Sequence, residues 1–260
     1  QQALWMADAG DTVYVLSGTY DSVHSFMTPL GRRDAIASIE DEVVLMGDNR
    51  GGVRIDYEMA EYGIICQNVG PSALITNLSI LGGTTRDEGL ADDGDGRLLS
   101  AGIICLDAAS PTIRDVDIEN GATGIVVRTE PGSDDSAPTI EGVVVARGSH
   151  HGLYVYQNGA SPVVVDRCTF VDNFDYGIYV SGGNADVSNS AVTHNGKHGI
   201  YSYLAVPSVV YCNVYWNDQM FPGPEGPLNY AGALSDLTGI DGNISAEPYC
   251  CDYFGTAGYD

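Results

Sequence analysis

The stretch YGIYVS, residues 176–181, is one copy of a short phrase that decides the fold. The phrase consists of a glycine, an aliphatic residue, a variable residue and a small or aliphatic residue. It recurs along the 260-residue chain, and recurrence of this kind is the signature of a repeat architecture. The six copies are YGIICQ (62–67), AGIICL (101–106), TGIVVR (123–128), HGLYVY (151–156), YGIYVS (176–181) and HGIYSY (198–203).

The spacing of the copies points to stacked coils. Their glycines stand 39, 22, 28, 25 and 22 residues apart, which gives a period of 22 to 25 residues with loops inserted into some turns. The longest insertion is expected at residues 81–100. A second alternating strand, often introduced by proline, lies between copies, as in SPTIRDVDI (110–118) and SPVVVDRCTF (161–170). Short strands separated by Gly, Asn, Asp and Pro corners predict an all-β parallel solenoid.

The residues of each phrase fall into ladders if the coils stack. One coil cannot bury its own inward side chains, whereas stacked coils pair each strand with its equivalent in the next coil. The position after each glycine is aliphatic in every copy and is predicted to point inward: Ile64, Ile103, Ile125, Leu153, Ile178 and Ile200. Two residues further on, a second inward ladder of small or aliphatic residues is predicted: Cys66, Cys105, Val127, Val155, Val180 and Ser202.

These phrases, together with the opening segment at residues 3–22 and the closing run GNISAEPYCCD (242–252), resemble the right-handed parallel β-helix proteins of the pectate-lyase-like superfamily, in particular secreted bacterial members. The resemblance covers nearly the whole chain. It implies a single domain over residues 1–260, with an N-terminal cap containing a short helix at 1–10, coils over 11–216 and an irregular C-terminal cap over 217–260. It also implies an extracellular or cell-surface location. It implies no particular activity, because this fold hosts enzymes, adhesins and structural proteins alike.

The charge of the chain restricts the classes of partner that it can bind. Eleven Lys and Arg residues against 35 Asp and Glu residues give a net charge of −24, which repels nucleic acid and anionic membranes. The same field repels polyanionic polysaccharides unless divalent cations or a local cationic patch offset it. No run of 18 apolar residues is present, so no transmembrane segment is expected.

The six cysteines are expected to be structural. The sequence has no CxxC motif and no Cys/His cluster at zinc-ligand spacing. Cys66, Cys105, Cys168 and Cys212 fall inside predicted strands, where buried thiols are common.

Polar and aromatic residues concentrate in the last three coils. The chain's only lysine and four of its five histidines lie within residues 150–198. The ladder that points outward becomes aromatic there, with Tyr154, Tyr179 and Tyr201. The two positions before the glycines add two further rows, predicted to edge these tyrosines: His150, Asp175 and Lys197, and His151, Tyr176 and His198.

Three interpretations of this cluster remain open. In the first, Tyr154, Tyr179 and Tyr201 contact the apolar face of a sugar while His150 and Asp175 bind its hydroxyls. In the second, the tyrosines stack on one another for structural reasons, and Asp175 with Lys197 is an exposed ion pair.

The third interpretation is catalytic. In β-elimination from a uronate, Lys197, His198 or Tyr176 would abstract the C5 proton, and Tyr176 or His151 would protonate the leaving oxygen. A cation would neutralise the uronate carboxylate. The neighbouring Asp175 favours the charged form of Lys197, which opposes its use as a base. The chain also lacks the DPHE motif of alginate epimerases and the GHG and RIK motifs of polygalacturonases.

A second acidic segment lies in the long insertion. ADDGDGR (91–97) places Asp92, Asp93 and Asp95 around glycines, as in a calcium loop, although the downstream Glu of an EF-hand is missing. The alternative is a solvated surface loop. Ca²⁺ is the only cofactor that the sequence suggests.

Together these features predict a secreted or cell-surface protein with a noncatalytic role, either contacting carbohydrate or serving a structural role in an assembly. The alternative is a polysaccharide lyase or epimerase acting on a uronate-containing glycan. Because solenoid ends and sides can stack, a homo-oligomer formed end to end or laterally is the expected protein partner.

Overall fold

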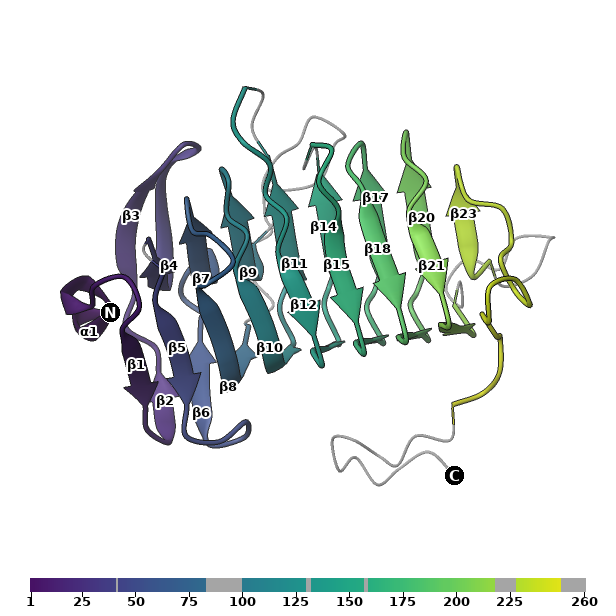
Figure 1. The fold of residues 1–260 in the computed structure, drawn as a ribbon. Coiled ribbons are helices and arrows are strands. Elements are labelled where there is room, and N and C mark those ends of the chain that lie inside the picture. The colour runs from purple at the N-terminus through teal and green to yellow at the C-terminus, as the bar shows by residue number, and fades with distance from the viewer. Residues whose placement is uncertain (41, 83–99, 130–131, 157–158, 218–227, 249–260) are drawn as a thin grey trace.

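The computed structural model describes residues 1–260 except 41, 83–99, 130–131, 157–158, 218–227 and 249–260. The chain winds into one elongated solenoid, with the short helix α1 (Gln2–Met6) at one end and strand β23 (Tyr230–Gly232) near the other (Figure 1). The predicted fold, a parallel β-helix with a short N-terminal helix, is confirmed. Among the residues described, no helix has the length and hydrophobicity needed to cross a membrane.

Each coil contributes to three faces. The first face is a sheet that contains the strands of all six glycine phrases, and it is parallel except for the antiparallel pairing of its first two strands, β3 and β4. Its strands are β3 (His24–Thr28), β4 (Gly31–Ile39), β7 (Tyr62–Gln67), β9 (Ala101–Leu106), β11 (Thr123–Arg128), β14 (Leu153–Tyr156), β17 (Ile178–Ser181), β20 (Ile200–Tyr203) and β23.

The second and third faces form one bent sheet. Strands β8 (Leu74–Leu81) and β10 (Thr112–Glu119) run through both faces and join them. The second face also contains β1 (Thr12–Val15), β5 (Val44–Gly47), β12 (Thr139–Glu141), β15 (Val163–Asp166), β18 (Ala185–Ser188) and β21 (Ser208–Val210). The third face also contains β2 (Gly18–Tyr20), β6 (Val53–Asp56), β13 (Val144–Ala146), β16 (Thr169–Val171), β19 (Ala191–Thr193) and β22 (Asn213–Tyr215).

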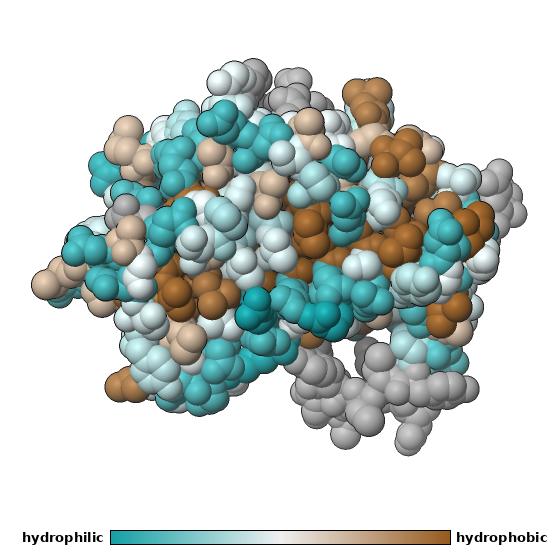
Figure 2. Space-filling view, in the orientation of Figure 1, coloured by the Kyte–Doolittle hydropathy of each residue, from teal (hydrophilic) through white to brown (hydrophobic). Residues whose placement is uncertain are grey.

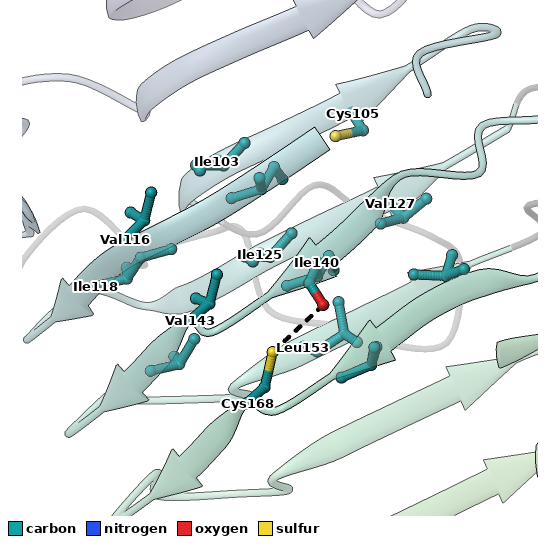
Figure 3. Packing of buried hydrophobic residues seen from close by; sticks show 14 of the residues in the cluster. Ile103, Cys105, Val116, Ile118, Ile125, Val127, Ile140, Val143, Leu153 and Cys168 are labelled. Carbon is teal, nitrogen blue, oxygen red and sulfur yellow. Dashed lines mark hydrogen bonds between the residues drawn. The ribbon is translucent and has the colours of Figure 1, made fainter. Parts of the chain in front are cut away.

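The register of the first face is the one that the phrases predict. Ile64 pairs with Ile103, and the same ladder continues through Ile125 and Leu153 to Ile178 and Ile200. All six side chains of this ladder are fully buried, as are those of the second inward ladder. Figure 3 shows Ile103, Ile125 and Leu153 from successive coils packing within the solenoid. This burial is the main stabilising contribution, at roughly 25 cal/mol for each Å² of apolar surface removed from water.

The cysteine predictions can be checked at four positions. Cys66, Cys105, Cys168 and Cys212 are buried free thiols. Cys66 and Cys105 are neighbours in the second inward ladder, as expected. Burial raises the pKa of Cys168 to about 12, and its thiol donates a hydrogen bond to the carbonyl of Ile140 (Figure 3). Cys250 and Cys251 lie outside the described residues.

The glycine of the phrase is required by a close approach between the first and third faces. A Cβ added at Gly177 would lie 2.3 Å from Val192 Cγ1 and 2.8 Å from the carbonyl oxygen of Gly199. Any larger residue would therefore push the strand away from the coil that follows it. The phrase contains glycine for its small size, which lets the inward aliphatic residue that follows reach the core.

The corners of the coils are built by residues in the left-handed region. The first corner, between the second and third faces, contains residues of positive φ such as Arg167 (52°) and Asn189 (50°). The second corner, between the third and first faces, has them at Asn120, Arg147, Asp172, His194 and Trp216. Left-handed residues other than glycine are uncommon, and here they recur at the corners of the later coils.

An asparagine ladder follows the second corner in the late coils. Asn173 Nδ2 donates to Asn195 Oδ1 over 2.9 Å, and Asn195 Nδ2 donates to Asn217 Oδ1 over 2.9 Å. The same carbonyl oxygens also accept the backbone N–H groups of Asn173 and Asn195. All three side chains are fully buried, so the ladder satisfies backbone and amide groups that would otherwise be costly to bury.

Candidate functional site

The outer side of the first face carries the predicted tyrosine row. Tyr154, Tyr179 and Tyr201 are in register across β14, β17 and β20. The ring centroids of Tyr154 and Tyr179 lie 5.0 Å apart with the planes at 26°, and those of Tyr179 and Tyr201 lie 5.2 Å apart in an edge-to-face arrangement. Aromatic pairs prefer both geometries, which stabilises the row without a ligand.

The row is not uniformly accessible. Tyr154 is only 5% exposed, whereas Tyr179 and Tyr201 are half-buried. The equivalent outward residues of earlier coils are Ile65, Ile104 and Val126, which are buried with Tyr154 in a second apolar cluster. A ligand on this face would therefore contact Tyr179 and Tyr201. Figure 2 shows a band of hydrophobic residues over the later coils, bordered by hydrophilic ones; tyrosine is not hydrophobic on its scale, so this band is not the tyrosine row.

A second aromatic row extends the first. Tyr176 stacks on His151 at 5.2 Å, on His198 at 5.7 Å and on Tyr201 at 4.9 Å. These six rings from the last three phrases, His151, Tyr154, Tyr176, Tyr179, His198 and Tyr201, are called the aromatic stack from here on.

His151 lies at the buried end of this stack. Its side chain is 3% exposed, and neither ring nitrogen has a hydrogen-bond partner among the described residues. Burial lowers its pKa to about 3, against the opposing effect of Asp175, whose carboxylate is 4.0 Å away. His151 is therefore neutral over the ordinary pH range.

A carboxylate network borders the stack, made by Asp175, His150 and Lys197. Lys197 Nζ lies 2.6 Å from Asp175 Oδ1, and His150 Nδ1 lies 3.3 Å from Asp175 Oδ2. Burial alone would raise the pKa of Asp175, but the hydrogen bonds from His150 and Lys197 outweigh it and lower that pKa to about 2. The ion pair that the sequence suggested is present, but its carboxylate is buried and only Lys197 is partly exposed.

This arrangement is better suited to binding than to proton transfer. Lys197 is held by Asp175 and lies 5.4 Å from the ring centroid of Tyr176, so its charge is committed to two partners. His151 is buried and neutral. Among the residues named for β-elimination, only His198 and Tyr176 are partly exposed on the stack.

The predicted calcium loop remains a prediction. Asp92, Asp93 and Asp95 lie outside the described residues. Within the part of the chain that is described, no group of three or more His, Cys, Asp or Glu side chains is arranged to hold a metal ion.

The sequence interpretation missed a groove at the second corner. Arg147, Asp172 and His194 line it, together with the exposed ring of Phe174. A signal for three of these residues was available, since each stands five positions before the glycine of its phrase. The asparagine ladder, four positions before Gly177 and Gly199, was detectable in the same way.

Comparison with known proteins finds structures of similar fold. The comparison with curated sequences finds no match. Pectin methylesterase from Yersinia enterocolitica is structurally similar, with a TM-score of 0.57 and 12% identity over 95% of this chain and 93% of that chain. The A-modules of mannuronan C-5 epimerases AlgE4 and AlgE6 from Azotobacter vinelandii give TM-scores of 0.40 and 0.42. Their identities are 16% and 15%, over 86% and 84% of this chain and 74% and 71% of theirs.

At such identities the structural likeness concerns the fold alone. The family model for the right-handed β-helix region matches residues 48–195, which is more than half of the chain. Those residues contain five of the six glycine phrases and most of the corners described above. The chain belongs to the right-handed β-helix family.

Proposed function

We propose that the protein is a noncatalytic carbohydrate-binding β-helix whose ligand lies across the aromatic stack. The observation that carries the proposal is the partly exposed pair of rings, Tyr179 and Tyr201, with His198 stacked on Tyr201 and Lys197 over the ring of Tyr176. Aromatic rings pack against the apolar face of a sugar, and nearby polar groups bind its hydroxyls. An exposed apolar surface rimmed by polar groups is also where binding sites of soluble proteins tend to lie.

The contacts favour binding over catalysis. A lyase or epimerase needs a base free to take a proton, whereas Lys197 is held at 2.6 Å by a carboxylate of depressed pKa. The proposed proton donor His151 is buried and cannot reach a substrate. The chain's net charge of −24 also disfavours a uronate polymer.

The setting of the proposal is extracellular. The structurally similar pectin methylesterase acts, by its name, on a polysaccharide, which supports a glycan as the ligand class. Polysaccharides are met at cell surfaces and outside cells, and we place this protein there. Stacking of one copy on another at a solenoid end remains part of the proposal.

The test is direct binding of neutral and acidic oligosaccharides by isothermal titration calorimetry. Tyr201→Ala is expected to weaken binding at least tenfold, because it removes an exposed ring of the stack. Tyr211→Ala is the matched control, since Tyr211 is 68% exposed at the first corner, away from the first face.

A parallel assay separates the enzymatic alternative. Ultraviolet absorbance is followed during incubation with uronate polysaccharides, with and without calcium, and a flat trace is expected. A rising unsaturated-product signal that Lys197→Ala abolishes would replace the proposal with a lyase. Absence of binding to every glycan by the wild-type protein would reject the carbohydrate role itself.

A further inference from the structure

A groove runs along the second corner, beside the carboxylate network. Its volume is ≈ 420 Å³, within the range of small-molecule sites. Arg147, Asp172 and His194 line it, with Phe174 and the small residues Gly148 and Gly196. The groove and the aromatic stack belong to the same three turns, since Arg147, Asp172 and His194 stand four positions before His151, Tyr176 and His198.

The backbone of the corner fixes the polar row. Arg147, Asp172 and His194 have φ values of 58°, 56° and 58°, so each projects from the same left-handed position. Arg147 N donates to the carbonyl of Val171, and Asp172 N to that of Thr193, which places the three residues on successive coils. Successive coils are separated by about one strand spacing, ~4.8 Å. The asparagine ladder follows Asp172 and His194 directly, at Asn173 and Asn195, and Gly148, which follows Arg147, donates its N–H to Asn173 Oδ1.

Phe174 is the unusual member of the groove. Its side chain is 47% exposed, and no aromatic ring of the described chain stacks on it. Its neighbours at the equivalent position of the adjacent coils are Ser149 and Gly196, which are too small to cover it. The rings of the aromatic stack, by contrast, pack on one another. An uncovered ring between small residues is an open platform.

We propose that this groove is a second carbohydrate subsite, which takes a neutral sugar ring stacked on Phe174. The carboxylate of Asp172 would accept hydrogen bonds from two sugar hydroxyls, and His194 would bond a third. The inference deepens the proposed function and rests on it for the ligand class. A glycan crossing the corner would reach both this groove and the aromatic stack.

The charges of the groove favour a neutral sugar over an acidic one. Asp172 would face an acidic sugar's carboxylate directly. The cation best placed to offset it, Arg147, already forms an ion pair with Glu119 and donates to Asn120 Oδ1. The net charge of −24 adds a repulsive field at long range.

The experiment titrates cellohexaose, xylohexaose, mannohexaose and hexagalacturonate into the wild-type protein and four variants. Phe174→Ala and Asp172→Ala test the groove, and Tyr201→Ala tests the aromatic stack. Val206→Ala is the control, because Val206 is an apolar side chain 70% exposed in the turn before β21. Circular dichroism melts establish that each variant is folded.

The expected result is that at least one neutral hexamer binds and that Phe174→Ala and Asp172→Ala each weaken it at least tenfold, with Val206→Ala unchanged. If Tyr201→Ala alone weakens binding, the groove is not a subsite and the proposed function stands without it. If only hexagalacturonate binds, the assignment of a neutral sugar is overturned. If nothing binds to the wild-type protein, the proposed function and the subsite fall together.

Discussion

The second corner of the solenoid is built in two ways. In the early coils it passes Gly82 and Gly121, and the buried ring of Tyr57 lies against both, so that a Cβ at Gly121 would be 1.8 Å from Tyr57 Oη. In the late coils the corner carries Asn173 and Asn195, whose amides bond from coil to coil. One ring fills the early corner, whereas each late coil adds its own hydrogen-bonded unit.

The difference shows which kind of corner can be repeated from coil to coil and so support an extended surface. A single ring from one coil cannot be extended, but an asparagine amide presents the same donor and acceptor to the next coil. The late corner is therefore a regular, satisfied scaffold. The aromatic stack, the carboxylate network and the groove lie on the coils of Asn173 and Asn195 and on the coil before them, where Gly148 N donates to Asn173 Oδ1.

Removal of one asparagine should break the late corner. Asn195→Ala deletes the acceptor of the Asn173 N–H groups and the donor to Asn217, leaving several buried polar groups unsatisfied. At about 1–3 kcal/mol for each such group, we expect a loss of about 4 kcal/mol in unfolding free energy. Denaturant unfolding measures it, with the exposed Ser208→Ala as control. A loss below about 1 kcal/mol would mean that the ladder does not stabilise the corner.

In the early corner, a steric clash should lower stability, and removal of the clashing atom should restore part of it. Gly121→Ala is expected to cost about 3 kcal/mol, because the new methyl group collides with Tyr57 Oη. Tyr57→Phe removes the colliding atom, so the double variant should be more stable than the two single effects predict. Gly51→Ala, where a Cβ meets nothing within 4 Å, is the control. Additive effects in the double-mutant cycle would refute this account of the early corner.

The glycine phrases predicted much of this molecule. They predicted the strands of the first face, the pairing of the two inward ladders and the alignment of Tyr154 with Tyr179 and Tyr201. They could do so because an inward aliphatic position and a sterically required glycine constrain the residue type in every coil. The pairing of Asp175 with Lys197 followed from the same alignment.

Other features depend on packing that the phrases do not encode. The burial of Tyr154 is set by its place beside the apolar cluster of the early coils. The burial of His151 depends on two rings of the following coil, Tyr176 and Tyr179. The groove beside Phe174 exists because its neighbours in the adjacent coils are small, which only the alignment of the turns shows.

Acid should lower the stability of the late coils through His151. The equivalent residue of an earlier coil is Thr123, which does not titrate. The folded pKa of His151, about 3, lies below its ordinary 6.5, so the unfolded state binds more protons between these values. Stability is therefore full above pH 6.5 and falls as the pH drops toward 3. Asp175, His150 and Lys197 face His151, and Asp175 adds a loss below pH ~4 because its folded pKa is about 2.

The measurement compares unfolding free energies at pH 7 and pH 4.5. His151→Phe is expected to remove about 2 kcal/mol of the loss between these two values, whatever it does to stability at pH 7. His194→Phe is the control, since His194 is only partly buried at the corner. An unchanged pH dependence in His151→Phe would show that another group governs the acid response.

The smallest change in stability is expected for Lys197, the exposed member of the carboxylate network. Lys197→Met removes the ion pair with Asp175, but the lysine is 38% exposed and its charge is screened by solvent. Unfolding free energy should change by less than about 1 kcal/mol. Thermal melts at low and high salt measure it. A loss of several kcal/mol would place this pair among the determinants of the fold.

The asparagine ladder has a consequence for how long the molecule can be. Asn173, Asn195 and Asn217 stand 22 residues apart, and each makes the same contacts to the next. Excision of residues 173–194 would join Asp172 to Asn195 in the same setting, and duplication of that segment would insert one more equivalent turn. Whole coils can thus be removed or added, each changing the length of the solenoid by ~4.8 Å, without redesign of any corner. Every added step would extend the outer side of the first face by one row of side chains.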